Sequence, residues 1–300
     1  MKDIPITREE LKPFMVRSDA KAFRILIWTW ASTMAIFAFT AIYSYWPVYI
    51  LSVFLLAGRQ QALAAIMHET AHNTLFATKK YNEVVCKWLC SPFLLMDGKS
   101  YIKAHLDHHR NAGTEHDPDL PNYKNYPVTK ASLTRKFLRD LVGLTGIKAF
   151  LFLLLSGKDL LTMKKRENWQ LTRGVCVNFF LFAVLWFCGV PELFALWFIA
   201  YLTVYMLIIR FRQIAEHAGV PDIYDLSPKY NTRSLPGGIL GFLFISPTVG
   251  LSYHCEHHAF MAVPTYNLKP LHELLKTKGY YDDIDIPNGY LSMLKQVVKS

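Results

Sequence analysis

The feature that most constrains this 300-residue chain is a pair of long stretches almost without charge. Residues 25–58 contain no charged side chain, and residues 174–209 contain one, Glu192. A membrane-spanning helix needs about 20 apolar residues, so each stretch is long enough for two. A turn at Tyr45–Trp46–Pro47 divides the first stretch, and Gly189 and Pro191 divide the second. The sequence therefore predicts two helical hairpins, with spans over about 25–45, 48–67, 174–190 and 192–209.

The basic residues avoid both predicted turns. Lys and Arg number 6 in residues 1–24, 17 in residues 68–173 and 9 in residues 210–300, within a net charge of +10. By the positive-inside rule, both termini and both large segments face the cytoplasm. Since no nucleic-acid-binding motif accompanies this charge, we expect no nucleic-acid partner. The fold we predict is an all-α integral membrane protein, residues 1–300 forming one domain, with a cytoplasmic helical cap over 68–173 and 210–300.

Three polar residues interrupt the second predicted span near its end. They are Arg59, Gln60 and Gln61. A charged or amide side chain is costly in contact with lipid. We therefore expect all three to face other helices.

The histidines are clustered at the ends of these spans. Most of the 11 fall into four motifs: His68 and His72 in H-E-T-A-H; His105, His108 and His109 in H-L-D-H-H; His254, His257 and His258 in H-C-E-H-H; and His217 in R-Q-I-A-E-H. Residues i, i+3 and i+4 share one face of a helix. Because both hairpins would enter the membrane from the same side, the motifs are expected to converge on one cytoplasmic site.

Imidazole is a good ligand for zinc, copper, iron and nickel. Eight or nine histidines exceed what one four-coordinate zinc ion uses, and they suit two metal ions with open positions. Carboxylates lie between and beside the histidines, at Glu69, Asp107, Asp117, Asp119, Glu216 and Glu256. A metal-bound imidazole usually donates its other N–H to a carboxylate or carbonyl, so some of these should accept such bonds, whereas others would only be solvated charges.

Two other interpretations of the motifs stay open at this point. H-E-T-A-H also fits a zinc protease, in which Glu69 would be the general base. That interpretation leaves both H-x-x-H-H motifs without a role. A non-enzymatic metal-binding protein is the second alternative.

The chain resembles the membrane fatty acid desaturase superfamily. The resemblance rests on three boxes in order, H-E-T-A-H-N-T-L-F, H-L-D-H-H-R-N-A-G-T-E-H-D-P-D and Y-H-C-E-H-H-A-F-M-A-V-P-T-Y-N-L-K-P-L-H, and covers most of residues 48–275. It implies four membrane helices and a cytosolic cap that holds a di-iron centre. The eight box positions match His68, His72, His105, His108, His109, His254, His257 and His258, and His217 matches a ninth ligand. His116 has no assured ligand counterpart, and we expect His272 on an amphipathic surface helix.

The activity that the resemblance implies is O2-dependent desaturation of a fatty acyl chain in a lipid or thioester. An unactivated methylene is too weakly acidic for a side-chain base, so a redox metal must supply the oxidant. Two iron ions and O2 would remove two hydrogens from neighbouring carbons. The alternative within the superfamily is a hydroxylase or ketolase of a lipid, alkane or carotenoid.

The sequence also indicates partners and location. It has no H-P-G-G haem motif, no G-x-G-x-x-G and no Cys-rich cluster, so we expect electrons from a separate ferredoxin or cytochrome b5-type protein. His254 stands where front-end desaturases commonly have Gln, which argues against a front-end enzyme. The first box has three intervening residues, unlike the four usual in stearoyl-CoA desaturases, which favours an acyl-lipid or sphingolipid-like type. A compact chain without an ER-retrieval signal favours the bacterial inner membrane over the ER.

Overall fold

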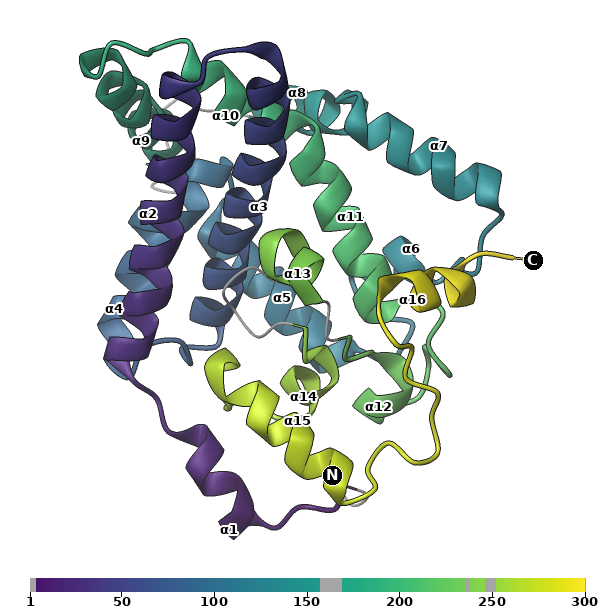
Figure 1. Cartoon of the computed structure of the whole chain (residues 1–300). Helices are drawn as coiled ribbons and strands as arrows, with labels where there is room; N and C mark the ends of the chain where they lie inside the picture. The colour runs from purple at the N-terminus through teal and green to yellow at the C-terminus, as the bar shows by residue number, and fades with distance from the viewer. Residues whose placement is uncertain (1–3, 157–168, 236–237, 246–251, 300) are drawn as a thin grey trace.

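The structure is a computed structural model that describes residues 4–156, 169–235, 238–245 and 252–299. Within these ranges it is helical and has no strand, and its two isolated β-bridges join Val128 to Val298 and Ser234 to Tyr253. Figure 1 shows an upright pair of long helices, with shorter helices gathered around and below them. The predicted all-α architecture is confirmed for the part of the chain that the structure describes.

The first hairpin consists of α2 (Asp19–Ile42) and α3 (Trp46–Ala71). Helix α2 begins six residues before the predicted span because Ser18 caps it, its side chain accepting a hydrogen bond from the Lys21 amide. The turn is confirmed, and Pro47 occupies the first turn of α3, where its missing N–H costs nothing. Helix α3 continues beyond residue 67, so that the first histidine motif lies on its last turns.

The polar residues of α3 face other helices, as predicted. Arg59 is buried and donates to Ser32 Oγ on α2 and to the Leu243 carbonyl, at 3.2 and 3.1 Å. Gln60 Nε2 donates to the Trp197 carbonyl at 2.8 Å. Gln61 is buried as well. These contacts join α3 to α2 within the first hairpin and to the second hairpin.

The second hairpin differs from its prediction in both helices. Its first helix, α9 (Trp169–Phe187), ends three residues early because the chain turns at Gly189, which has a positive φ of 78°. Its second helix runs to His217 instead of residue 209, as α10 (Leu193–Leu202) and α11 (Val204–His217), with a break at Thr203. The extension brings the R-Q-I-A-E-H motif onto the helix itself.

Three helices in the described part of the chain are long and apolar enough to cross a membrane. They are Asp19–Ile42, Trp46–Ala71 and Leu193–His217. The apolar part of α9, Thr172–Phe187, is shorter than a full span. The four-span topology and the cytoplasmic position of the cap therefore remain predictions, and cap residues 157–168 lie outside the described residues.

Most of the remaining helices surround the lower end of the hairpins, whereas α7 and α8 lie beside the upper part of the second hairpin (Figure 1). The longer ones are α5 (Gly98–Asn111), α7 (Lys130–Leu141), α8 (Leu144–Ser156) and α15 (Leu268–Thr277). The shorter ones are α1 (Arg8–Leu11), α4 (Lys79–Val85), α6 (Leu120–Tyr123), α12 (Pro228–Asn231), α13 (Gly238–Leu240), α14 (His254–Ala259) and α16 (Tyr290–Val297). Single 3-10 turns lie at Lys12–Met15, Ser91–Leu94 and Thr265–Asn267, and π-helical turns at Cys86–Cys90 and Gly241–Ile245.

Candidate metal centre

The first histidine motif lies where α3 ends. His68 is on the last turn and is buried, and His72 is the C-cap residue. The chain leaves the helix through Asn73, whose φ of 56° lies in the left-handed region that Asn tolerates. Residues four apart lie one above the other on a helix, so both imidazoles point to the same side. This end of α3 faces α5.

The second motif occupies the last two turns of α5. Asp97 caps this helix by accepting a hydrogen bond from the Lys99 amide at 2.8 Å. His105 and His108 are buried, and His109 is partly buried. The helix thus presents all three imidazoles toward the centre of the molecule.

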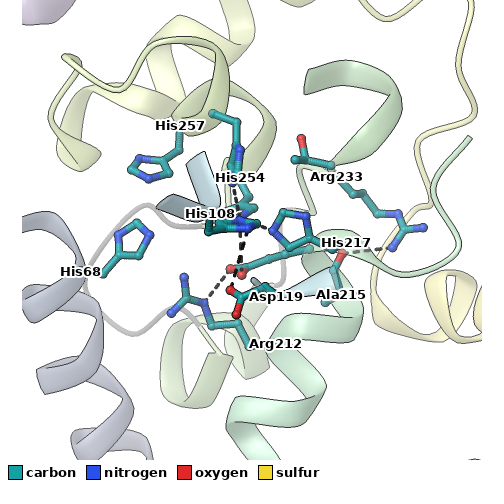
Figure 2. Close-up of polar contacts among 12 residues, drawn as sticks. His68, His108, Asp119, Arg212, Ala215, His217, Arg233, His254 and His257 are labelled. Atoms are coloured by element: carbon teal, nitrogen blue, oxygen red, sulfur yellow. Dashed lines mark hydrogen bonds and ion pairs between the residues drawn. The ribbon is translucent and has the colours of Figure 1, made fainter. Parts of the chain in front are cut away.

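The other four histidines come from α11 and α14. His217 is the last residue of α11, and Gly219 redirects the chain with a φ of 61°. His254, His257 and His258 lie on the single short helix α14. Figure 2 shows His217 and His254 pointing toward each other, with His108 beside them.

The nine predicted histidines form two groups. The first contains His68, His72, His105, His109 and His257, and the second contains His108, His217, His254 and His258. Within each group, one ring nitrogen from every residue lies within 4.8 Å of the others. The structure therefore brings together every residue that the motifs predicted, and it divides their side chains between two groups.

The ring nitrogens within each group face one another at short range. In the first group, Nε2 of His72 lies 2.7 Å from Nε2 of His105, and Nε2 of His257 lies 3.1 Å from that of His109. In the second group, His254 Nε2 lies 2.9 Å from His217 Nε2 and 3.1 Å from His258 Nε2. One proton cannot satisfy three convergent nitrogens, whereas a cation that binds nitrogen at about 2.0–2.1 Å can.

Burial keeps these imidazoles neutral. It lowers the pKa of His72 to about 4 and that of His109 to about 2. Burial, with the neighbouring imidazoles, also places the pKa well below its ordinary value in His105, His254, His257 and His258. Neutral imidazole has the free lone pair that a metal requires. Near pH 7 the groups can therefore bind a cation without first releasing protons.

Two buried carboxylates orient histidines from outside the groups. Asp117 accepts a hydrogen bond from His108 Nδ1 at 2.8 Å and another from the Tyr123 hydroxyl. Glu69 Oε1 lies 3.2 Å from His68 Nδ1. Both contacts leave Nε2 of the histidine directed at its group, and His68 Nε2 is buried without a hydrogen-bond partner among the described residues. This is the usual arrangement around metal-binding histidines.

The other predicted carboxylates have different surroundings. Asp119 lies 3.9 Å from His108 Nδ1, and burial raises its pKa. Glu216 Oε1 accepts from Arg212 Nε at 2.6 Å, while its Oε2 lies 3.7 Å from His254 Nε2. Asp107 pairs with Arg110 on the outside of α5 and is a solvated charge.

Glu256 fixes α14 from the side opposite the histidines. Its buried carboxylate accepts hydrogen bonds from the Ser234 and Tyr281 hydroxyls, and its Oε1 lies 2.5 Å from His272 Nδ1. His272 lies on the amphipathic helix α15, as predicted, and its side chain is on the buried face of that helix. Helix α15 buries this side chain because Glu256 needs a partner there. His116 is exposed and belongs to neither group.

One polar segment, Arg233 and Ser234, joins α11 and α14, two of the three helices that form the second group, and no sequence motif predicted it. Arg233 is buried and donates to the carbonyls of Ala215, Ala218 and Gly219 at 2.8–3.0 Å, at the end of α11 (Figure 2). The next residue, Ser234, accepts from the Cys255 amide on α14 at 3.0 Å. Burial lowers the pKa of Arg233 to about 10, so it stays charged near neutral pH. No local motif marks this residue, because its partners are 14 to 18 positions away.

The donor set fits metal ions. Both groups are rich in neutral nitrogen and largely buried, and in each group one member, His68 or His108, has a carboxylate on its outer ring nitrogen. Nitrogen ligands of this kind suit iron, zinc and copper. Two adjacent groups further indicate a site for two ions.

Comparisons with known proteins agree with this geometry. The family model described as Fatty acid desaturase matches residues 44–286. A dihydrorhizobitoxine desaturase of Bradyrhizobium elkanii is 24% identical over 249 residues, 78% of this chain and 70% of that protein. A Caenorhabditis elegans protein named "Putative sphingolipid delta(4)-desaturase/C4-monooxygenase" is 24% identical over 258 residues, 84% of this chain and 65% of that protein. The chain spans about two thirds of the length of these relatives.

The family match covers α3 of the first hairpin, all nine clustered histidines and the second hairpin. The three apolar helices and the two metal-compatible groups are what a membrane-associated oxidoreductase of this kind requires. The chain belongs to the fatty acid desaturase family.

Proposed function

We propose that this protein uses two iron ions and O2 to introduce a double bond into a fatty acyl chain of a lipid or thioester. The observation that carries the proposal is the division of nine histidines into two adjacent groups. The first ion would be held by His68, His72, His105, His109 and His257, and the second by His108, His217, His254 and His258. Membership of the desaturase family supports the lipid acyl substrate.

Iron bound at such a site would supply the O2-dependent oxidation that an unactivated hydrocarbon requires. In the overall reaction two neighbouring carbons each lose a hydrogen, and these two hydrogens, together with O2, two electrons and two protons, become two molecules of water. The chain's residues prepare this site. Asp117 and Glu69 hold the Nδ1 protons of His108 and His68 and so fix each tautomer. The burial of these groups keeps bulk water away from the oxidation.

Hydroxylation is the second candidate. The name of the C. elegans relative pairs a desaturase with a C4-monooxygenase. Both outcomes begin with loss of one hydrogen from the acyl chain. They differ in whether a second hydrogen is removed or oxygen is added. The product, an olefin or an alcohol, distinguishes the two.

The electrons are expected from a separate ferredoxin or cytochrome b5-type protein. The net charge of +10 supports docking of an acidic donor. The concentration of Lys and Arg outside the hairpin turns supports a cytoplasmic site and cytoplasmic termini. Protease accessibility of the two turns and of the cap in sealed vesicles tests that orientation.

The test combines metal content with product analysis. Purified protein should contain about two irons per chain, and cells that express it should accumulate an unsaturated acyl product. His254→Ala should lose iron and product, while His116→Ala, the exposed control, should keep both. One zinc per chain, with no iron and no activity after iron reconstitution, would contradict the proposal. A Glu69→Gln variant distinguishes a desaturase from a zinc protease. A zinc protease would lose its general base and its activity, whereas a desaturase should keep partial activity.

A further inference from the structure

A surface groove lies at the junction of α7 and α8, on a side of the molecule that the histidine groups do not use. Its volume is about 930 Å³. Three cations line it, Lys130, Arg135 and Arg139, together with the apolar side chains of Leu138, Val142 and Leu144. All six side chains are exposed. A groove that combines these two kinds of side chain fits an amphipathic ligand.

The contacts of α7 with the second hairpin show at which level along the candidate membrane span the groove lies. The apolar run of the helix Leu193–His217 ends at residue 209, and Arg210 is its first charged residue. Arg210 pairs with Asp140 at the end of α7, with Nη2 3.1 Å from Oδ1. Helix α7 therefore contacts this candidate span at the level where its apolar part ends. With this helix placed as a membrane span, this is the level of the lipid headgroups.

Helix α8 lies against a more apolar part of the same span. Gly146 packs so closely on Leu202 that a Cβ would overlap the Leu202 carbonyl oxygen. Leu202 lies seven residues before the end of the apolar run, about 10 Å along a helix. Leu151 and Phe152, further along α8, are also exposed. The groove thus runs from the headgroup level into a surface that faces hydrocarbon.

The charges of the groove are not balanced within it. None of its lining residues in the described part of the chain is acidic. The one carboxylate of α7, Asp140, is buried and bound by Arg210 and Thr145, although Arg139 Nε also lies 3.9 Å from it. The exposed cations are thus available to an anionic partner.

We propose that this groove binds an anionic phospholipid of the surrounding membrane. Its phosphate contacts Arg135 and Arg139, which lie one helical turn apart, Lys130 adds to the positive charge of the groove, and its acyl chain lies along Leu138, Val142 and Leu144. Arginine suits the headgroup because its guanidinium donates two parallel hydrogen bonds to phosphate. The site depends on the membrane placement of the protein and is separate from the oxidation chemistry.

An acidic electron-donor protein is the competing occupant. Such a partner would be attracted by the same cations. It would not explain why half of the groove is apolar, or why that half continues into the exposed apolar side of α8. The apolar lining therefore favours lipid.

The test measures lipid binding on the full-length protein. Delipidated protein in detergent is titrated with phosphatidylglycerol or phosphatidylcholine, and bound lipid is counted by native mass spectrometry. Wild-type protein should prefer phosphatidylglycerol. In Arg135→Gln/Arg139→Gln, loss of two cations should weaken phosphatidylglycerol binding about 30-fold and phosphatidylcholine binding much less, because the choline already neutralises its phosphate. The matched control, Lys269→Gln/Lys276→Gln, removes two exposed cations from α15 and should bind as wild type.

A second measurement locates the lipid. Phosphatidylglycerol with a photoreactive headgroup should crosslink to residues 130–144, and the double variant should lose this crosslink. Three results would each overturn the proposal. They are equal affinity of wild-type protein and the double variant for phosphatidylglycerol, crosslinks only outside residues 130–144, and a double variant that loses donor-dependent turnover while its lipid binding is intact. Iron content and thermal unfolding check that the variant is folded. Lipid binding is measured without turnover. Absence of lipid binding would therefore not contradict the proposed oxidation, and absence of oxidation would not contradict lipid binding.

Discussion

Removal of the Asp117 carboxylate should empty one half of the metal centre. Asp117 is buried, and it accepts a hydrogen bond from His108 Nδ1 at 2.8 Å and one from the Tyr123 hydroxyl. When His108 Nε2 binds a metal, Nδ1 must carry the proton, and Asp117 is its acceptor. In Asp117→Ala that proton has no partner and the ring is free to turn.

The expected cost has two separable parts. Loss of a carboxylate behind a metal-binding histidine typically lowers metal affinity 10- to 100-fold, which is about 1.4–2.8 kcal/mol. The Tyr123 hydroxyl also loses its acceptor, which costs about 1–3 kcal/mol of folding free energy with or without metal. The first part appears in metal binding and the second in unfolding. Asp117→Asn keeps an acceptor for His108 and should lose less affinity.

The assay measures iron retained per chain against increasing chelator. Wild-type protein should hold about two irons, and Asp117→Ala should lose one of them at 10- to 100-fold lower chelator concentration. Asp107→Ala is the matched control, because this carboxylate pairs with Arg110 on the outer side of α5, the helix that carries His108. If Asp117→Ala keeps both irons with wild-type affinity, then the division of the histidines into two separately supported groups is wrong.

Three further predictions concern other contacts. His217→Ala should lower iron from about two to about one per chain, and full retention of iron and activity would exclude His217 as a ligand. Arg233→Gln frees three carbonyls at the end of α11 and should cost at least about 3 kcal/mol in urea unfolding; Arg135→Gln, an exposed control, should change little. The N-terminal segment should loosen in acid, because hydrogen bonds from Lys278 and Thr7 lower the pKa of Glu10 from 4.5 to about 2. A group with a lowered pKa stabilises the fold above its ordinary value and loses this effect as pH falls toward 2. The difference in amide exchange of residues 4–16 between wild type and Glu10→Gln should therefore be clear at pH 5 and vanish near pH 2.

Local patterns were enough to predict the helices that carry the site. Uncharged runs indicated the hairpins, and Pro47 and Gly189 marked their turns. The i, i+3, i+4 spacing predicted that each histidine motif would present one face, and all nine side chains do converge. Arg59 and Gln60 were rightly placed against other helices, since the cost of burying polar groups in lipid can be judged from sequence alone.

Other features depended on contacts between distant segments. Helix α11 extends to His217 because Arg233 and the cap hold its end, and a hydropathy pattern contains no sign of that. His272 is buried because Glu256, 16 residues earlier, directs a carboxylate at it. Its spacing from Leu268, Leu271 and Leu275 places His272 on the inner face of its own helix, but does not identify Glu256 as its partner.

By itself, the sequence determined which histidines face inward, because the helical period fixes the direction of each side chain relative to its neighbours. Only the tertiary structure decided how they are shared between the two groups. His105 and His109 join the first group while His108 joins the second, and His254 and His258 join the second while His257 joins the first. Consecutive residues on a helix are 100° apart, so His108 and His109 point to different partners. Which partner each meets depends on where α3, α11 and α14 are packed, and those positions are set by long-range contacts that a local pattern does not contain.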